Sequence, residues 1–438
     1  MKNLRAAALA LMIALATSAT AAVEASTTHV RVRVHAAAAV TASNATDKPS
    51  LALSNPVNRG VAVGQWTNLE SNNYSIADPC KPQEWTVKQA KAAALQLHFA
   101  SINLAGHKLI VSAPNGSFAQ EFSSESALHN VTTKTIPGST AKISFQPSAL
   151  NTRTSAGVAV AGSCDSKLMR PSFTLDKVSA FWSQQMKVKK EAICGKNTVK
   201  NPTCLGGDMY AKSKAVMHLM QGAADGKIYV CTAWLWGNIG YIITNNHCIQ
   251  DSTELLSATF EFQEDIGCDD DYSFHNCKFD GALIGFMDLR FVKTSTVHDY
   301  SLLMIRNPRL ANQIVQKYGY LKLQRAPVKV GDQIYIPQHP NGNAKKIAST
   351  DDDSDTSVAK IIAVGASASD GTTTFGGLVQ YAADTDHGSS GSPVISRTSN
   401  AVVGLHRLAG NCANSGTSAD SLISELDMFL PGIDGIQG

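Results

Sequence analysis

Short apolar runs, each ended within a few residues by turn-forming residues, constrain the fold of this chain more than any other feature. In the first half the runs are HVRVRVH (29–35), LQLHFASINL (95–104), KLIVSA (108–113), AKISFQ (141–146) and GVAVAG (157–162). The connections between them are rich in Gly, Pro, Asn and Ser, as in APNGS (113–117). Alternating runs of this length between turn residues predict β-strands. We therefore predict a β-sandwich-like N-terminal domain.

The second half repeats the same pattern over a longer stretch. We predict strands at 228–236, 241–246, 255–262, 300–306, 333–337, 359–365, 378–382, 393–396 and 402–406. Helical spacing of apolar residues occurs only at 211–220 and at 421–433. The second half is therefore expected to be an all-β domain of barrel size with a terminal helix.

The N-terminus has the pattern of a secretory signal peptide. Lys2 and Arg5 precede an apolar run over 6–16, and Ala19-Thr20-Ala21 is a small-residue cleavage site. We expect residues 1–21 to be removed and the protein to be secreted. No later run is long and apolar enough to predict a membrane span. The net charge of +3, without a dense basic block, argues against nucleic acid as a partner.

Secretion changes how the nine cysteines are interpreted. No CxxC pair is present, so the spacing of a zinc site is absent, and we expect neither a metal nor a cofactor. Cysteines spread along a secreted chain are mostly in disulfides, and an odd count leaves one thiol unpaired or paired between chains. Cys80 and Cys164 fall in the N-terminal half, where a bond between them would staple that domain.

A basic joint separates the two halves. Lys187, Lys189 and Lys190 lie in FWSQQMKVKKEAICGKN (181–197). We interpret the joint as a domain boundary and a candidate processing site, the alternative being a solvated linker. The expected division is 1–21 signal peptide, 22–190 β-rich N-terminal domain and 191–438 second domain.

Three short segments of the second half carry chemically active residues. His247 follows an apolar strand in IITNNHC (242–248), and Asp299 precedes one in HDYSLLMI (298–305). Ser390 lies between two glycines in TDHGSSGSPV (385–394). Each segment taken alone is more often structural than functional.

Together the three residue types form a set with a chemical use. A serine hydroxyl becomes a good nucleophile only when an imidazole takes its proton and a carboxylate orients the imidazole. Gly388 permits a tight turn, and the N–H groups of Gly388 and Ser390 would stabilise a developing oxyanion. The chain order His, Asp, Ser differs from the α/β-hydrolase and subtilisin orders.

These segments resemble those of the trypsin-like (chymotrypsin-fold) secreted serine peptidases. The matching stretches are CTAWL (231–235), TNNHC (244–248), DYSLL (299–303) and GSSGSP (388–393), and the resemblance covers roughly 194–425. It implies two antiparallel six-stranded β-barrels with a C-terminal helix. By the same resemblance His247 is the general base, Asp299 the orienting acid and Ser390 the nucleophile.

Within that family the chain is most similar to the bacterial lysyl endopeptidase group, through GLHRLAGNC (404–412) and PQHPNGNAKKI (337–347). The group's disulfide pattern implies Cys194–Cys412, Cys231–Cys248, and Cys204 paired with either Cys268 or Cys277. A β-rich N-terminal propeptide is typical of the group, so a zymogen is expected. The N-terminal domain would then be an inhibitor or a chaperone of a monomeric enzyme.

The resemblance leaves the substrate preference open. Asp420 lies near the carboxylate that reads lysine in the lysyl group, His406 matches the histidine of the same segment, and Asp384 sits where trypsins keep a specificity aspartate. Either carboxylate would favour a basic P1 residue in a protein or peptide substrate. The alternatives are a Glu-specific peptidase, because glutamyl-specific relatives use a histidine in the 404–406 segment, and an inactive homologue acting as a binding module.

Overall fold

The computed structural model describes residues 62–148, 170–182 and 195–437, with Ile193 and short strands at 26–27, 151–153 and 159–161. Gaps inside these ranges are 125, 263, 266, 269–277, 280, 352–356, 372, 411–412 and 430–432. The expected strand at 29–35, the basic joint at 187–190 and Cys164, Cys194, Cys277 and Cys412 lie outside the described residues.

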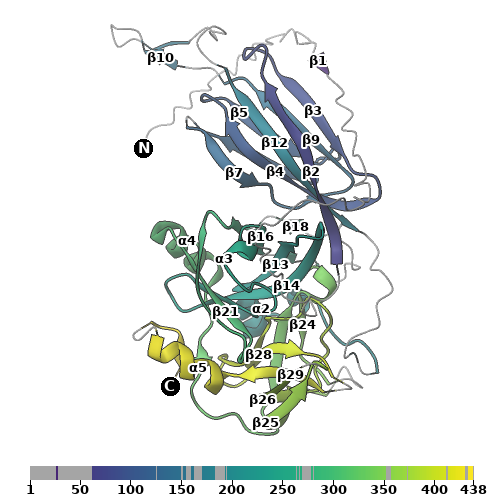
Figure 1. Ribbon diagram of the computed structural model, residues 1–438, viewed down its shortest axis with the longest axis vertical. Helices are drawn as coiled ribbons and strands as arrows, with labels where there is room; N and C mark the ends of the chain where they lie inside the picture. Colours follow the sequence, from purple (N-terminus) through teal and green to yellow (C-terminus); the bar gives the residue numbers. More distant parts are fainter. Residues whose placement is uncertain are drawn as a thin grey trace, which may run out of the picture.

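The N-terminal domain is the predicted sandwich of two antiparallel sheets (Figure 1). One sheet contains β3 (Gln83–Lys88), β9 (Thr140–Gln146), β5 (Lys108–Ser112) and β6 (Ala119–Ser123), with β1 (Ser26–Thr27) added in parallel at its edge. The other contains β2 (Ala62–Ser75), β12 (Ser172–Trp182), β4 (Ala92–Asn103) and β7 (Leu128–Thr132), with β8 (Ile136–Pro137) paired to β4. Alternate residues of both sheets, such as Phe99, Phe145 and Phe173, meet in one buried core. A separate small hairpin is formed by β10 (Asn151–Arg153) and β11 (Ala159–Ala161).

The first barrel sheet of the second domain is antiparallel, in the order β19-β16-β13-β14-β15-β21-β20. Its strands are β13 (Val216–Gly222), β14 (Lys227–Trp236), β15 (Tyr241–Thr244), β16 (Ala258–Phe262), β19 (Leu283–Gly285), β20 (Leu289–Ser295) and β21 (Tyr300–Ile305). The short strands β17 (Glu264–Asp265) and β18 (Lys278–Phe279) pair with each other. Trp234, Trp236 and Tyr300 are among the largest side chains buried in this domain.

The second barrel sheet has the order β24-β23-β27-β28-β29-β26-β25. Its strands are β23 (Ile334–Gln338), β24 (Lys346–Ala348), β25 (Ile361–Ser369), β26 (Thr374–Tyr381), β27 (Pro393–Ser396), β28 (Val402–Leu408) and β29 (Asn414–Ser418). The N–H of Gly331 donates to the carbonyl of Ile361, and that of Ile334 to Ala359, which brings the two ends of the sheet together. The short strands β22 (Leu323–Gln324) and β30 (Ile436–Gln437) pair in parallel beside β28.

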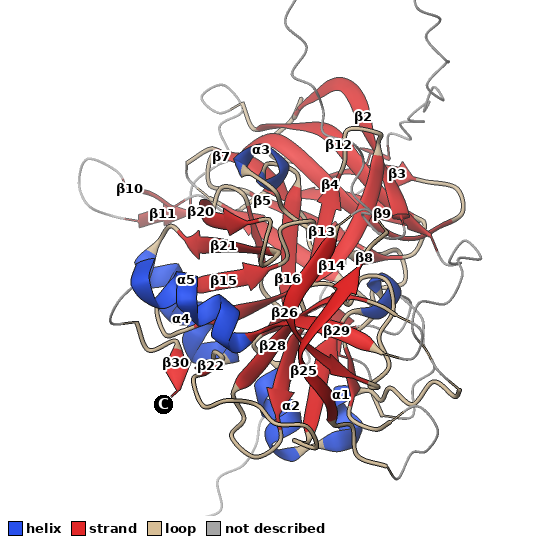
Figure 2. Cartoon of the chain, turned by 60° about the horizontal axis from the view of Figure 1, so that its bottom comes forward, coloured by secondary structure: helices blue, strands red, loops and turns tan. Residues whose placement is uncertain are grey.

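Helices are few and lie at the edges of the strands (Figure 2). They are α1 (Pro202–Leu205), α2 (Gly207–Ser213), α3 (Ser252–Leu255), α4 (Pro308–Tyr318), α5 (Ala419–Phe429) and the 3-10 turn η1 (Pro340–Gly342). The all-β class, the barrel architecture and the terminal helix are confirmed. Within the described residues no helix has the length and apolar character needed to cross a membrane.

The prediction of a helix over 211–220 is wrong beyond its first residues. Helix α2 ends at Ser213, and Val216 begins strand β13. All but the last residue of β13 are buried, so its apolar residues do not alternate with polar ones and mimic helical spacing. Helix α4 was not predicted, although Asn307 caps it and Pro308 occupies its first turn.

The two domains share one sheet, which the sequence analysis did not predict. Strand β2 of the sandwich pairs with β14 of the first barrel, with Gln65 opposite Lys227 and Gly64 opposite Ile228. Figure 1 shows β2 running down from the sandwich toward the barrels. An apolar cluster spans the same junction, formed by Val63, Ala94 and Phe181 on one side and Met220, Ile228 and Val230 on the other.

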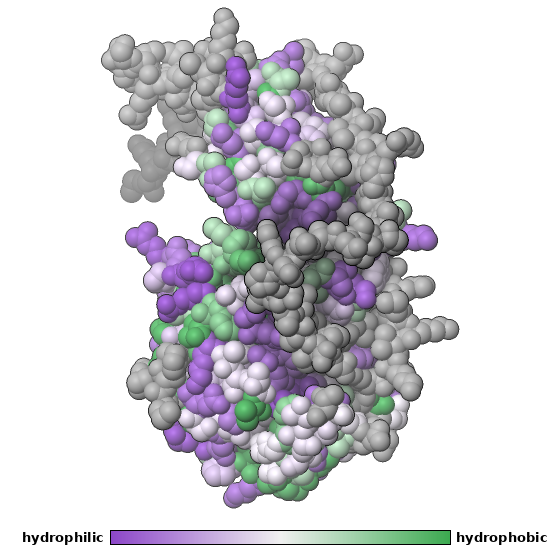
Figure 3. Space-filling model, viewed as in Figure 1, coloured by the Kyte–Doolittle hydropathy of each residue, from purple (hydrophilic) through white to green (hydrophobic). Residues whose placement is uncertain are grey.

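A buried polar contact adds to this junction. The hydroxyl of Thr135, in the sandwich, donates to Oε2 of Glu261 on β16 over 2.8 Å, and both residues are fully buried. The amide of Gln96 donates in turn to the Thr135 hydroxyl over 3.1 Å. On the face drawn in Figure 3 the described surface is largely hydrophilic or neutral, with apolar patches that are small and scattered. The apolar cluster around Val63 and Val230 is buried at the junction, whereas Leu256 and Met287, which line a hollow beside it, remain more than half exposed.

Candidate active site

Strand pairing brings two of the three predicted residues together. Strand β15 pairs antiparallel with β21, with Thr244 opposite Ser301. The chain leaving β15 therefore lies beside the chain entering β21. His247 comes three residues after the end of β15, and Asp299 comes directly before the start of β21.

The carboxylate of Asp299 holds His247 by two routes. Nδ1 of the imidazole lies 2.9 Å from Oδ2 and 3.1 Å from Oδ1, and the backbone N–H of His247 donates to Oδ1 over 3.0 Å. The buried amide of Asn245 donates to the Asp299 carbonyl over 2.7 Å. Asp299 itself adopts a φ of 48°, a left-handed conformation that is uncommon outside glycine. These hydrogen bonds thus hold the residue Asp299 in a backbone conformation that an aspartate rarely adopts.

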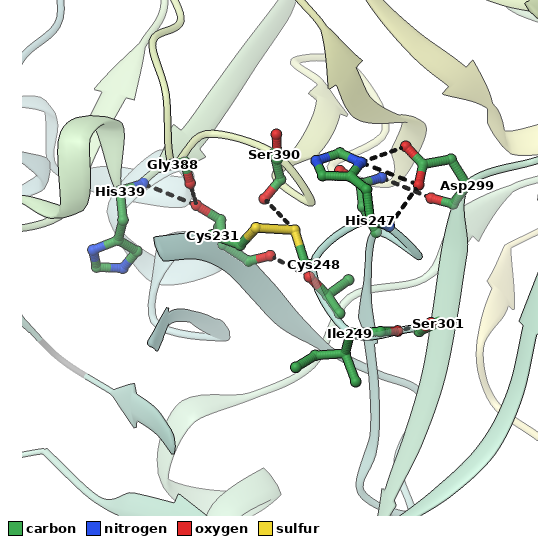
Figure 4. The surroundings of a disulfide bond; sticks show 12 residues. Cys231, His247, Cys248, Ile249, Asp299, Ser301, His339, Gly388 and Ser390 are labelled. Atoms are coloured by element: carbon green, nitrogen blue, oxygen red, sulfur yellow. Dashed lines mark hydrogen bonds and ion pairs between the residues drawn. A yellow bond between two sulfur atoms is a disulfide. The ribbon is translucent and has the colours of Figure 1, made fainter. Parts of the chain in front are cut away.

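The turn that carries Ser390 is anchored to both barrels. The hydroxyl of Thr232, on β14, donates to the Gly388 carbonyl over 2.9 Å, and the Thr232 N–H donates to the Ser390 carbonyl over 2.8 Å. From the second barrel, the carbonyl of His406 on β28 accepts the N–H of Gly391 over 2.9 Å. Ser390 thus sits where the two barrels meet. Figure 4 shows the His247 ring between Ser390 and Asp299, with one ring nitrogen turned to each side.

Two backbone donors of this turn are left unused. The N–H groups of Ser389, Gly391 and Ser392 all donate to backbone carbonyls. In the described part of the chain, those of Gly388 and Ser390 have no protein acceptor. Gly388 has a φ of 88° and Gly391 a φ of 86°, which L-residues with side chains rarely adopt. The turn therefore offers two free donors beside the Ser390 side chain.

A disulfide ties the segment that carries His247 to strand β14. Cys231 on β14 is bonded to Cys248, the residue after His247, with the two Cα atoms 6.2 Å apart. The Sγ of Cys248 lies 4.0 Å from the Ser390 carbonyl oxygen (Figure 4). A second disulfide joins Cys204 to Cys268, which resolves the alternative left open for Cys204.

The remaining predicted pairings are not described in full. Cys80 is disulfide-bonded, while Cys164 lies outside the described residues. Both Cys194 and Cys412 lie outside them as well. The Cys80–Cys164 and Cys194–Cys412 bonds therefore stay predictions.

The three predicted specificity residues lie in different surroundings. Asp384 is fully buried, and its Oδ2 accepts the N–H of Thr198 over 2.7 Å and the Thr198 hydroxyl over 3.1 Å. This contact fastens the first residues of the second domain to the chain before the Ser390 turn. Asp420 is exposed in the first turn of α5. His406 is buried, with Nδ1 2.8 Å from the Tyr381 hydroxyl.

Burial dominates the protonation of His406. It lowers the pKa of the imidazole to about 3, assisted by the positive charge that His247 can carry and opposed by Asp299. Burial also raises the pKa of Tyr381 well above its usual value, so the phenol keeps its proton. His406 is thus a neutral ring close to His247, and a negatively charged substrate group would find no charge partner in this ring.

Two residues that support Asp299 were missed by the sequence analysis. Glu425 on α5 accepts hydrogen bonds from Nδ1 of His298 over 2.6 Å and from the Tyr300 hydroxyl over 2.9 Å, the residues on either side of Asp299. Burial would raise the pKa of Glu425, but bonds from Tyr300, His298 and further donors lower it to about 2. Arg407 on β28 is the second, with Nε 3.4 Å from Asp299 Oδ2. A charged residue inside the mostly apolar run VVGLHRL (402–408) was the available signal for Arg407.

The close packing of the turn that carries Ser390 predicts the effect of Gly391→Ala. A Cβ there would meet the Thr232 carbonyl oxygen and lie 2.7 Å from Thr244 Oγ1, in addition to the unfavourable φ. Gly365→Ala is the matched control, because Gly365 has a φ of 65° but nothing within 4 Å of its Cβ position. We expect the control to lose about 1–2 kcal/mol of unfolding free energy and Gly391→Ala clearly more, as measured by urea unfolding. Equal losses would contradict the packing described.

The depressed pKa of His406 predicts how stability depends on pH. An unfolded histidine takes up its proton near pH 6.5, whereas folded His406 stays neutral until about pH 3. The parent therefore loses stability as pH falls below about 6.5, by about 1.4 kcal/mol per pH unit from this residue alone. In His406→Gln that contribution is absent, so its stability deficit relative to the parent should shrink between pH 6 and pH 4. Urea unfolding at several pH values tests this, and a constant deficit would refute it.

Comparisons with known proteins agree with the architecture of the second domain. Residues 231–405 match the family model described as a trypsin-like peptidase domain. The secreted RxLR effector protein 73 of Plasmopara viticola is 32% identical over 244 residues, 54% of this chain and 56% of that protein. The chain thus spans little more than half the length of that curated relative.

Similar solved structures are distant in sequence and shape. The active form of a protease from M. tuberculosis is 14% identical and covers 58% of this chain and 96% of its own, at a TM-score of 0.37. A serine endoprotease from Yersinia pestis is 13% identical and covers 51% of this chain and 66% of its own, at a TM-score of 0.36. The fold assignment therefore rests on the strand pairing, and over residues 231–405 the chain matches a trypsin-like peptidase domain.

Proposed function

We propose that this protein is a serine endopeptidase in which Ser390 is the nucleophile, His247 the general base and Asp299 the residue that orients His247. The observation that carries the proposal is the position of the His247 ring, between the Asp299 carboxylate and the half-exposed Ser390. The match of residues 231–405 to a peptidase domain supports the same reaction class.

The reaction follows from these positions. As the Ser390 hydroxyl oxygen attacks the substrate carbonyl carbon, its proton passes to Nε2 of His247. The free N–H groups of Gly388 and Ser390 receive the oxyanion that forms. His247 then protonates the leaving amine, which departs and leaves an acyl-enzyme on Ser390. A water molecule, deprotonated by His247, hydrolyses the acyl-enzyme and restores the serine.

For the P1 side chain we propose a basic residue. The support comes from the resemblance to the lysyl group and from Asp420, an exposed carboxylate at the start of α5. Asp384 is a poor candidate for direct contact with substrate, because it is buried against Thr198. The neutral state of His406 counts against a Glu-specific pocket that relies on a protonated imidazole. An inactive binding module is the second candidate, and the full set of catalytic residue types weighs against it.

We further propose secretion and cleavage at the basic joint. The disulfides Cys231–Cys248 and Cys204–Cys268 are consistent with an oxidising compartment, and the similar protein of P. viticola is named as secreted. Because the sandwich and the first barrel share a sheet, a cut after Lys190 need not release the N-terminal domain. N-terminal sequencing of secreted protein should find Glu191 first, and an active chain that begins near Ala22 would refute processing.

The catalytic proposal predicts that Ser390→Ala lowers kcat for peptide hydrolysis about a million-fold without unfolding the chain. It also predicts that a fluorophosphonate probe labels the parent and fails to label Ser390→Ala. Ser424→Ala, an exposed serine on α5, should be labelled like the parent. Retained hydrolysis in Ser390→Ala would end the proposal, and a folded parent that resists labelling would favour the binding module.

The P1 proposal predicts cleavage after Lys and Arg in a mixed peptide library, read by mass spectrometry of the products. Asp420→Asn should lower kcat/KM for a Lys substrate by about tenfold or more and leave a Leu substrate nearly unaffected, because only the former brings a charge to the carboxylate. Cleavage mainly after Glu, or an equal effect of Asp420→Asn on both substrates, would contradict it.

A further inference from the structure

A buried arginine contacts the carboxylate that holds His247. The side chain of Arg407 is only 3% exposed, and its Nε lies 3.4 Å from Oδ2 of Asp299. That same oxygen lies 2.9 Å from Nδ1 of His247. The carboxylate of Asp299 is therefore shared between an imidazole on one side and a guanidinium on the other.

The guanidinium is held in place from three other directions. Its NH1 lies 3.2 Å from the Val297 carbonyl and 3.5 Å from the Thr417 hydroxyl, and donates to both. Its central carbon lies 3.7 Å from the centre of the Phe375 ring, a cation–π contact. Thr417 in turn donates to the His298 carbonyl over 2.8 Å. Arg407 thus contacts both the side chain of Asp299 and the segment of chain that precedes Asp299.

A charged group at this place has a definite electrostatic effect. Burial lowers the pKa of Arg407, with Asp299 and Asp370 opposing, and a guanidinium remains protonated at any pH at which proteins fold. A buried carboxylate is costly unless it is paired and hydrogen-bonded. While His247 is neutral, Arg407 is the cation in contact with this carboxylate among the described residues. Protonation of His247 would place a second cation against the same carboxylate.

We infer that Arg407 is a positioning residue that holds Asp299 in register with His247, and that its charge makes His247 take up a proton less readily than it would beside Asp299 alone. The inference rests on the proposed function and adds a residue that supports its general base. Arg407 is too deeply buried to touch a substrate, so it acts only through Asp299.

The other groups near His247 leave this role to Arg407. His406 on β28 stays neutral down to about pH 3, so it contributes no charge above that pH. His298 lies beyond Asp299 and is paired with Glu425. Asp370, in the turn between β25 and β26, acts on Arg407. In the described part of the chain, the side chains that form ion pairs with Asp299 are those of His247 and Arg407.

The experiment compares Arg407→Met with the parent by two readouts. In the Ser390→Ala background with isotopically labelled histidine, NMR follows the titration of the His247 ring, assigned by its loss in His247→Gln. We expect the midpoint of this titration to rise by about one pH unit when the cation is removed, and Arg407→Lys to restore part of the shift. In the active chain, kcat should fall by about tenfold at unchanged KM, with the acid limb of the pH profile shifted in the same direction.

A matched control separates this role from simple loss of structure. Arg397, also in the second barrel, donates to the carbonyls of Ser349 over 2.7 Å and Ile334 over 3.4 Å, and neither bond reaches the site. Arg397→Met should lower stability and leave the His247 titration unchanged. Should Arg407→Met fail to fold, Arg407→Gln takes its place, because the glutamine amide can still donate to the Val297 carbonyl.

The outcomes distinguish the two proposals. An unchanged His247 midpoint in a folded neutral variant overturns the inference, whatever the activity. A shifted His247 midpoint supports the role of Arg407 whether or not the chain is active. The proposed reaction is refuted separately, if the parent hydrolyses no peptide or if Ser390→Ala keeps its activity.

Discussion

The antiparallel pairing of β15 with β21 is the constraint on which the site depends. It places the residues that follow β15 beside the residue that precedes β21. His247 and Asp299 therefore meet as a direct result of strand pairing. Asn245 and the backbone N–H of His247 then hold Asp299 in a left-handed conformation. The two residues of this contact come from the first barrel, but elements that follow it in the chain support them. Arg407 on β28 contacts the Asp299 carboxylate, and Glu425 on α5 accepts hydrogen bonds from both neighbours of Asp299. The second barrel therefore supplies support for Asp299 as well as Ser390.

Three charged residues connect segments around this contact: Glu425, Arg407 and Asp384. Glu425 fixes the residues on both sides of Asp299, and Arg407 contacts its carboxylate. Asp384 holds Thr198 and so ties the start of the domain to the chain before Ser390. Buried ionic groups seldom add much net stability, but they penalise any arrangement in which one partner is displaced. Here they specify the relative positions of segments from three parts of the chain.

Much of the architecture could be predicted from the sequence because its strands are short, alternating and separated by turn residues. The motifs around His247, Asp299 and Ser390 could be found because their residue types have strong local requirements, such as glycine at 388 and 391. Strand β13 was mistaken for a helix because burial of nearly all its residues removes the alternation that identifies strands. The roles of Arg407 and Glu425 could not be predicted, because they depend on contacts between elements that are distant in the sequence, and such contacts leave no local pattern.

The shared sheet between the domains has a consequence for the second domain on its own. Strand β14 would lose its neighbour over Lys227–Tyr229, and Met220, Ile228 and Val230 would lose their cover. An unpaired strand edge beside exposed apolar side chains can pair with the same edge of a second molecule. The second domain without the sandwich would therefore tend to aggregate. The sandwich thus keeps the second domain soluble for as long as the two remain in contact.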